Sequence, residues 1–193
     1  MQFDELIALA DEKGALFWKA FGTMYQGSVL ALTAKASDTV ELLASAIAAW
    51  RSTGSTLWLP LGLSYLSNAH AQLGQFDDAW RCIGEVMTAM ETSKEKWYEA
   101  EVHRIAGEIA LLSRQPNAAK SEAYFERALI VARNQQAKSL ELRAAMSMAR
   151  LWRDQGKRQQ SHDLLTPAYG WFTEGFDTLD LKEAKSLLEQ LTA

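Results

Sequence analysis

Small side chains recur about every forty residues along the chain, and this regularity constrains the fold more than any other feature. With Ala79 as the reference, equivalent small residues fall at Thr39, Ser121 and Ser161, in steps of 40, 42 and 40. Apolar residues follow each of them four and seven positions later: Leu43, Ile83, Phe125 and Leu165, then Ala46, Val86, Ala128 and Ala168. This i, i+4, i+7 stripe predicts four amphipathic helices, each packed closely on a neighbour through its small residue.

A second series of small residues precedes the first and predicts a partner for each of these helices. Its members are Gly27, Ser67, Gly107 and Ala149, with a large apolar residue nine positions before each: Trp18, Trp58, Tyr98 and Leu140. We therefore expect helix pairs at 15–52, 56–92, 95–134 and 137–174, within a single domain 1–193. Residues 3–13 should form a partial repeat, 180–191 a closing helix, and the chain should be part of a longer protein.

The turn between the two helices of the second pair has a distinctive sequence motif. Leu73 to Ala79 reads LGQFDDA, in which a glycine ends one helix and acidic residues begin the next. This phrase resembles the turn of tetratricopeptide repeats. The resemblance implies an all-α, right-handed α-solenoid of about four helix pairs plus the two flanking helices. Because the spacing of 40 to 42 exceeds the usual period of about 34, we expect longer helices than in a standard repeat.

The C-terminal half resembles one family more specifically. WYEAEVHRIAGEIALL from Trp97, FERALIVARNQQAKSLELRAAMSMARLWRDQGK from Phe125 and YGWFTEGFDTLDLKEAKSLLEQL from Tyr169 are similar to the tetratricopeptide tail of bacterial fusion proteins. Those proteins join a class III adenylate or guanylate cyclase domain to a signal-transduction ATPase domain. The resemblance implies a regulatory tail. No cyclase metal-binding aspartates and no phosphate-binding glycine loop can be matched here, so no catalytic residue carries over.

Composition excludes several classes of function. The net charge is -4 and basic residues form no run, which argues against nucleic-acid binding. The most apolar stretch, Leu57 to Leu63, is far shorter than the roughly 20 residues that span a membrane. One cysteine, Cys82, allows no internal disulfide, and the N-terminus lacks a secretory signal. We expect a cytoplasmic protein with no cofactor and no bound metal.

Candidate catalytic residues have simpler structural explanations. His70 and His103 fall on packing faces of the predicted helices rather than in a ligand set. Ser161, His162 and Asp163 are consecutive, and consecutive helical residues point about 100° apart, so they cannot converge as a hydrolase triad does. Cys82 lies beside a predicted core position and has no catalytic histidine motif near it. Most of the seven tryptophans are expected to pack in the core.

The first helices of the pairs should line a concave groove, where we expect partner binding. In the fourth pair one helical stripe contains Arg143, Met146, Arg150 and Arg153. The equivalent stripe of the third pair contains Glu101, Arg104 and Glu108, and that of the second pair contains Asn68, with Gln72 beside it. One hypothesis is that the arginines bind an acidic segment of a partner protein or of upstream domains. The alternative is that they pair with Glu101, Glu108 and Glu141. The expected function is a non-catalytic protein-interaction and regulatory module; a second hypothesis is self-association into a homo-oligomer.

Overall fold

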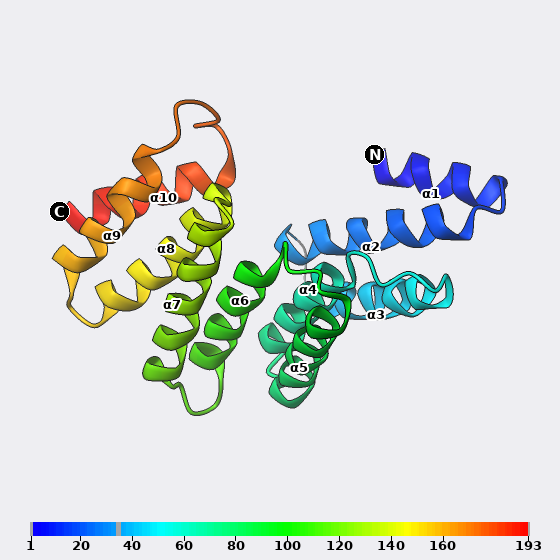
Figure 1. Ribbon diagram of the computed structural model, residues 1–193, viewed down its shortest axis with the longest axis horizontal. Coiled ribbons are helices and arrows are strands. Elements are labelled where there is room, and N and C mark those ends of the chain that lie inside the picture. Colours follow the sequence, from blue (N-terminus) through cyan, green and yellow to red (C-terminus); the bar gives the residue numbers. More distant parts are fainter. Residues whose placement is uncertain (1, 34–35, 193) are drawn as a thin grey trace. The chain divides into compact units, whose positions relative to one another are not determined.

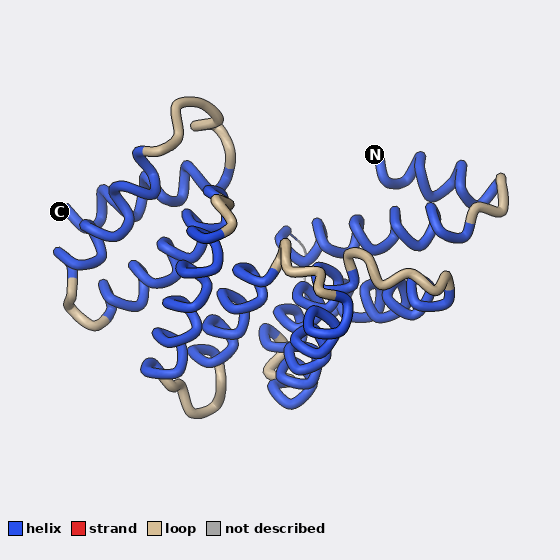
Figure 2. Tube along the Cα trace, viewed as in Figure 1, coloured by secondary structure: helices blue, strands red, loops and turns tan. Residues whose placement is uncertain are grey.

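The computed structural model describes residues 2–33 and 36–192, and every regular element in these ranges is a helix (Figures 1 and 2). The all-α prediction is therefore confirmed for the described chain. The helices are α1 (Gln2–Glu12), α2 (Leu16–Thr33), α3 (Ala36–Ser52), α4 (Leu59–Gln72), α5 (Phe76–Ser93), α6 (Glu99–Leu112), α7 (Ala118–Asn134), α8 (Lys138–Asp154), α9 (Arg158–Gly170) and α10 (Leu179–Thr192). Residues 34 and 35, inside the predicted pair 15–52, lie outside the described residues.

The chain forms two compact units. Residues 1–98 and 112–114 make the first, and residues 99–111 and 115–193 make the second. In the first unit α1 packs on α2, α2 on α3 and α4, and α4 on α5. In the second, α8 packs between α7 and α9, and α10 packs on both α8 and α9.

Each small residue of the predicted series is buried where two helices meet. Thr39, Ala79, Ser121 and Ser161 are all fully buried. A Cβ atom added to Gly27 would lie 2.7 Å from Leu43 Cδ2, and one added to Gly107 would lie 2.4 Å from Phe125 Cε1. Ser67 makes the same kind of close approach with a hydrogen bond, its hydroxyl donating to the Ala79 carbonyl at 2.7 Å. A larger residue at Gly27 or Gly107 would therefore overlap the Leu43 or Phe125 side chain of the neighbouring helix.

The turns between helices recur with the spacing of the small residues. Gly74 and Gly156, 82 positions apart, both adopt positive φ, at 73° and 79°, which glycine adopts without a steric penalty. The same backbone bonds close both turns: Gln75 N to His70 O and Ala79 N to Gln75 O in one, Lys157 N to Trp152 O and Ser161 N to Lys157 O in the other. The turn after α6 is closed differently, because Asn117 Oδ1 accepts the Lys120 amide at 2.9 Å as an N-cap.

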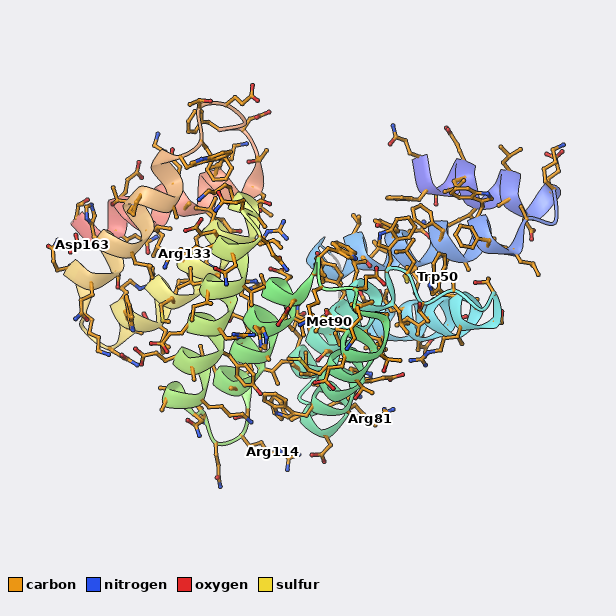
Figure 3. All side chains as sticks on the ribbon, in the orientation of Figure 1. Trp50, Arg81, Met90, Arg114, Arg133 and Asp163 are labelled. Atoms are coloured by element: carbon orange, nitrogen blue, oxygen red, sulfur yellow. The ribbon has the colours of Figure 1, made fainter. Side chains whose placement is uncertain are left out.

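Aromatic side chains fill the core of the first unit. Trp50 of α3, labelled in Figure 3, is fully buried, and its ring centroid lies 4.8 Å from that of Phe17 and 6.2 Å from that of Trp58. The ring centroids of Phe21 and Trp58 lie 4.9 Å apart. Trp18 lies at the edge of this cluster: half of it is exposed, and its ring centroid lies 5.2 Å from that of Phe17 and 5.8 Å from that of Phe21.

Candidate functional site

A network of opposite charges covers one face of α6 and α8 in the second unit. Arg104 on α6 holds Glu101 with two bonds, from Nε to Oε2 at 3.0 Å and from Nη2 to Oε1 at 2.8 Å. Its Nη1 donates to Glu108 Oε1 at 3.3 Å, and the Ser147 hydroxyl of α8 donates to the same oxygen at 2.6 Å. Arg143 Nη1 lies 3.7 Å from Glu101 Oε1. The network therefore links α6 to α8 through Arg104, Ser147 and Arg143.

Glu101 is the buried centre of this network, with only 2% of its surface exposed. Burial by itself would raise the pKa of its carboxyl, but the charges of Arg104 and Arg143 outweigh burial and hold the pKa below its usual range. The carboxylate is therefore ionised in the folded chain and acts as an acceptor for arginine. It is not a general acid.

The arginine stripe of α8 forms ion pairs and hydrogen bonds with the closing helix α10. Arg143 Nε donates to Asp180 Oδ2 at 2.7 Å, and Arg150 Nη2 donates to Glu183 Oε2 at 2.7 Å. Arg153 completes the series with a bond from Nη1 to Gln190 Oε1 at 2.8 Å. The acidic segment that these arginines bind in the structure thus belongs to the same chain.

Apolar packing places α10 on this face. Its buried side chains repeat every three or four residues and join one core cluster with residues of α7, α8 and α9: Leu181, Ala184, Leu187 and Leu191. A buried leucine contributes about 1.5–3 kcal/mol, whereas an exposed ion pair contributes about 0–1 kcal/mol. The leucines therefore account for most of the stability with which α10 is held, and the ion pairs with α8 form as a consequence of that packing.

The residues proposed from sequence fall into three groups. Arg104, Glu108, Arg143, Arg150 and Arg153 lie together on the polar face with Glu101. Met146 is buried, at 3% exposed, and packs in the core rather than on that face. Asn68, half-buried, and Gln72, exposed, lie on α4 of the other unit.

The acidic partners on α10 were not among the residues proposed from sequence. Of the three partners proposed for the arginines, Glu101 and Glu108 do join the network, whereas Glu141 pairs with Arg133 at 2.8 Å and Lys138 at 2.9 Å. The spacing of Asp180 and Glu183, three residues apart on a helix with an apolar stripe, was the available signal.

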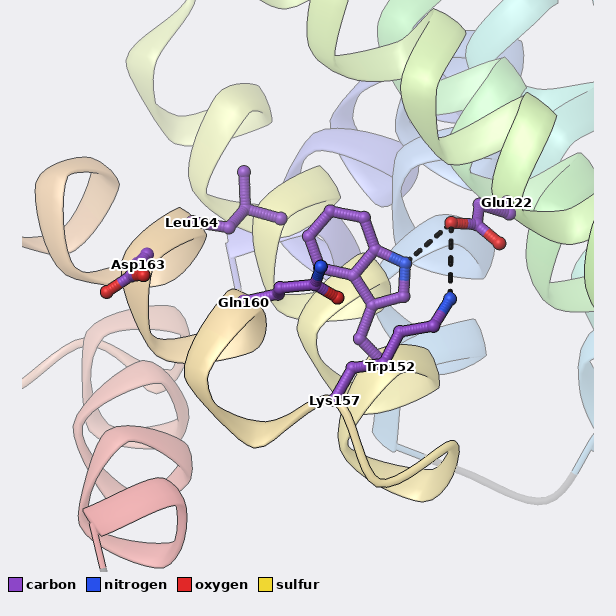
Figure 4. Close-up of a pocket in the computed structure, with 6 residues that line it drawn as sticks. All are labelled: Glu122, Trp152, Lys157, Gln160, Asp163 and Leu164. Carbon is purple, nitrogen blue, oxygen red and sulfur yellow. Dashed lines mark hydrogen bonds and ion pairs between the residues drawn. The ribbon is translucent and has the colours of Figure 1, made fainter.

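A shallow cleft of about 490 Å³ opens between α7, α8 and α9, and Figure 4 shows its lining. The Trp152 indole N–H donates to Glu122 Oε1 at 2.7 Å, and Lys157 Nζ lies 3.9 Å from the same oxygen. Gln160, Asp163 and Leu164 complete the wall. Glu122 is engaged by these two donors, and the cleft holds no nucleophile beside a base.

Ser161 and Cys82 are buried in the helix packing, and His103 is partly buried. The Ser161 hydroxyl is buried and donates to the Lys157 carbonyl at 2.9 Å, so it is not presented to a substrate. Burial raises the pKa of the Cys82 thiol, which disfavours the reactive thiolate. Burial lowers the pKa of His103; the carboxylate of Glu99 opposes this shift and Arg127 adds to it. Within residues 2–33 and 36–192, no three metal-ligating side chains cluster.

Comparison of the sequence with known proteins does not assign the chain to a family. No protein-family model and no curated protein matches the chain. Among the described helices, none is both long enough and apolar enough to cross a bilayer.

Proposed function

We propose that this chain is a non-catalytic protein-interaction and regulatory module built from tetratricopeptide-like helix pairs of a right-handed α-solenoid. The observation that carries the proposal is the recurrence of the same turn, with the same backbone bonds, at Gly74 and Gly156. Repeats of this kind stack side by side, and their exposed faces form extended binding surfaces. The polar face of α6 and α8 is such a surface in the second unit.

The partner of the polar face is a protein segment that carries carboxylates. The contacts of α10 support this choice, because Asp180 and Glu183 already bind two of the arginines. Arg150 keeps 40% of its side chain exposed and Arg153 keeps 31%, so both retain edges that a further acidic segment can reach. Arginine suits this role because its planar fork binds a carboxylate with two parallel hydrogen bonds.

The parent protein, on this proposal, is a bacterial signalling protein of the nucleotide-cyclase type, and the module is its C-terminal part in the cytoplasm. The resemblance of the amino-acid sequence from Trp97 onward to the tails of such proteins supports this origin. The segment bound at the polar face then belongs either to the upstream domains or to a separate regulatory protein.

A charge-reversal variant tests the polar face. Arg150→Glu removes one exposed ion pair and sets a carboxylate beside Glu183, which should cost the fold no more than about 1 kcal/mol. Arg158→Glu, on the exposed start of α9, makes the same change of charge away from this face. We expect a partner captured from bacterial extract to be lost with Arg150→Glu and retained with Arg158→Glu. Equal capture by both variants would remove the polar face from the proposal.

Self-association is the second candidate, and the segment between α9 and α10 favours it. Trp171, Phe176 and Leu179 expose 57%, 47% and 62% of their surfaces within nine residues. Exposed apolar clusters of this kind mark interaction sites. Light scattering over a range of concentrations distinguishes the two candidates, since a constant monomer mass excludes self-association.

A further inference from the structure

The shallow cleft between α7, α8 and α9 combines an aromatic ring with two carboxylates. Glu122 of α7 and Asp163 of α9 lie on opposite sides of the Trp152 ring (Figure 4). Trp152 is half-buried, because it packs against the buried cluster that contains Phe125 and also lines the cleft. The cleft therefore offers an aromatic surface between two negative charges.

The hydrogen bond of the Trp152 side chain fixes the ring and strengthens its attraction for a cation. Its indole N–H donates to Glu122 Oε1 at 2.7 Å, so this donor is already satisfied within the chain and the ring face is the part that a ligand contacts. Donation to an anion increases the electron density of the indole, and the face of tryptophan attracts cations more strongly than that of tyrosine or phenylalanine. The ring therefore favours a positively charged ligand.

The carboxylates keep acceptor positions for such a ligand. Glu122 uses Oε1 for its contacts with Trp152 and Lys157, and Asp163 uses Oδ1 to accept the Gln159 amide at 2.8 Å. Among the described residues, no group donates a hydrogen bond to Glu122 Oε2 or to Asp163 Oδ2. Each carboxylate thus has one oxygen that a cationic donor can engage.

Lys157 is the cation that already lies beside the cleft, and its contact with Glu122 is weak. The Lys157 Nζ atom is 3.9 Å from Glu122 Oε1, which is too long for a hydrogen bond, and 42% of the lysine side chain is exposed. An exposed pair with this geometry contributes little to stability. A better-fitting cation can therefore displace the lysine from Glu122.

We propose that this cleft binds an arginine side chain presented by a partner protein. The planar guanidinium stacks on the Trp152 ring and donates to Oε2 of Glu122. Asp163 attracts the same positive charge from the opposite wall, and the Gln160 side chain supplies an amide oxygen as a further acceptor. The site does not depend on the polar face of α6 and α8, which binds the opposite charge.

The shape of the cleft favours arginine on a protein surface over other cations. A lysine ammonium is compact, strongly hydrated and unable to stack, whereas a guanidinium is planar and more weakly hydrated. The cleft volume of about 490 Å³ lies within the range of about 300–1,000 Å³ for ligand pockets, so the side chain and the backbone that carries it both fit. A shallow cleft leaves a free small molecule largely in water, but a partner protein covers the arginine that it presents.

Nuclear magnetic resonance of the full chain tests the site. The probe is a blocked peptide with one arginine between two glycines on each side, and the signal is the indole N–H of Trp152, assigned by its loss in Trp152→Phe. We expect a saturable shift of this signal. Matched peptides with lysine, or with citrulline, which has the shape of arginine without its charge, should bind at least about fivefold more weakly.

Matched variants locate the binding. Glu122→Gln removes the charge but keeps an oxygen that accepts the indole N–H, and it should weaken binding by about fivefold or more. Glu126→Gln makes the same change one turn later on α7, at an exposed residue outside the cleft, and should leave the affinity unchanged. Lys157→Gln removes the competing cation and should strengthen binding by about twofold or more.

Several results would overturn the proposal. The Trp152 signal could fail to shift, or the shift could be equal for the arginine and citrulline peptides or survive Glu122→Gln. Equal binding of the lysine peptide would remove the assignment to arginine. Tighter binding of free arginine than of the peptide would assign the cleft to a small molecule, and a shift on concentrating the chain alone would assign it to a second copy.

Discussion

Replacing Gly107 by alanine tests the close approach of α6 and α7. The new Cβ would lie 2.4 Å from Phe125 Cε1 and 2.6 Å from its Cδ1. Ordinary carbon contacts are about 3.5–4.0 Å, so the ring has to move by about 1 Å in a core where it is fully buried. Overpacking of this kind costs about 1–3 kcal/mol, and alanine returns about 0.5–1 kcal/mol through its helix propensity. We expect a net loss of about 1–2 kcal/mol.

Gly84 provides the matched control for this substitution. It also lies inside a helix, α5, but a Cβ there would meet nothing within 4 Å. Gly84→Ala should therefore stabilise the chain by about 0.5–1 kcal/mol, since only helix propensity changes. Gly27→Ala should fall between the two, because the side chain that it meets, Leu43, can rotate away more easily than a phenyl ring.

Urea unfolding followed by circular dichroism measures these free energies, with separate transitions fitted if the two units unfold separately. The double variant Gly107→Ala with Phe125→Leu should lose less stability than the sum of the two single variants, because the smaller side chain relieves the clash. Two results would refute the reasoning: a Gly107→Ala chain as stable as the parent, or strict additivity in the double variant.

Two further predictions concern buried groups. Glu101→Gln should destabilise the second unit by about 3 kcal/mol near neutral pH, since it leaves two arginines without their buried anion. The folded-state pKa of Glu101 lies below its ordinary value of 4.5, so the stability that its carboxylate contributes is present above that pH and is lost as the pH falls through the folded-state pKa. The difference in thermal unfolding temperature between variant and parent should therefore shrink in acid. A difference that does not change with pH would contradict this. Cys82 should react with a thiol reagent only when its helix opens, because it is 3% exposed and burial raises its pKa; the absorbance change on labelling should follow unfolding as urea is raised, and fast labelling of the native chain would contradict the burial.

The sequence periodicity singled out small residues that the structure buries. Two helices can cross closely only where side chains are small, and each helix pair has one such crossing. This is why the series Thr39, Ala79, Ser121 and Ser161 could be recognised from sequence. The paired large residues, such as Phe125 opposite Gly107, follow from the same rule. The polar stripe of α8 could also be recognised, because helical spacing puts Arg143 and Arg150 on one side.

Only the tertiary structure decided what meets that stripe. Helical spacing shows that Asp180 and Glu183 share one side of a helix, but it does not show that this side meets Arg143 and Arg150 rather than another surface. The choice depends on how the four buried residues of α10 fill the space beside α8 and α9, which is a property of three helices packed together. Helical periodicity is a local property and can be recognised in the sequence alone. The pairing of surface charges depends on the final positions of the helices, which nonlocal apolar packing determines.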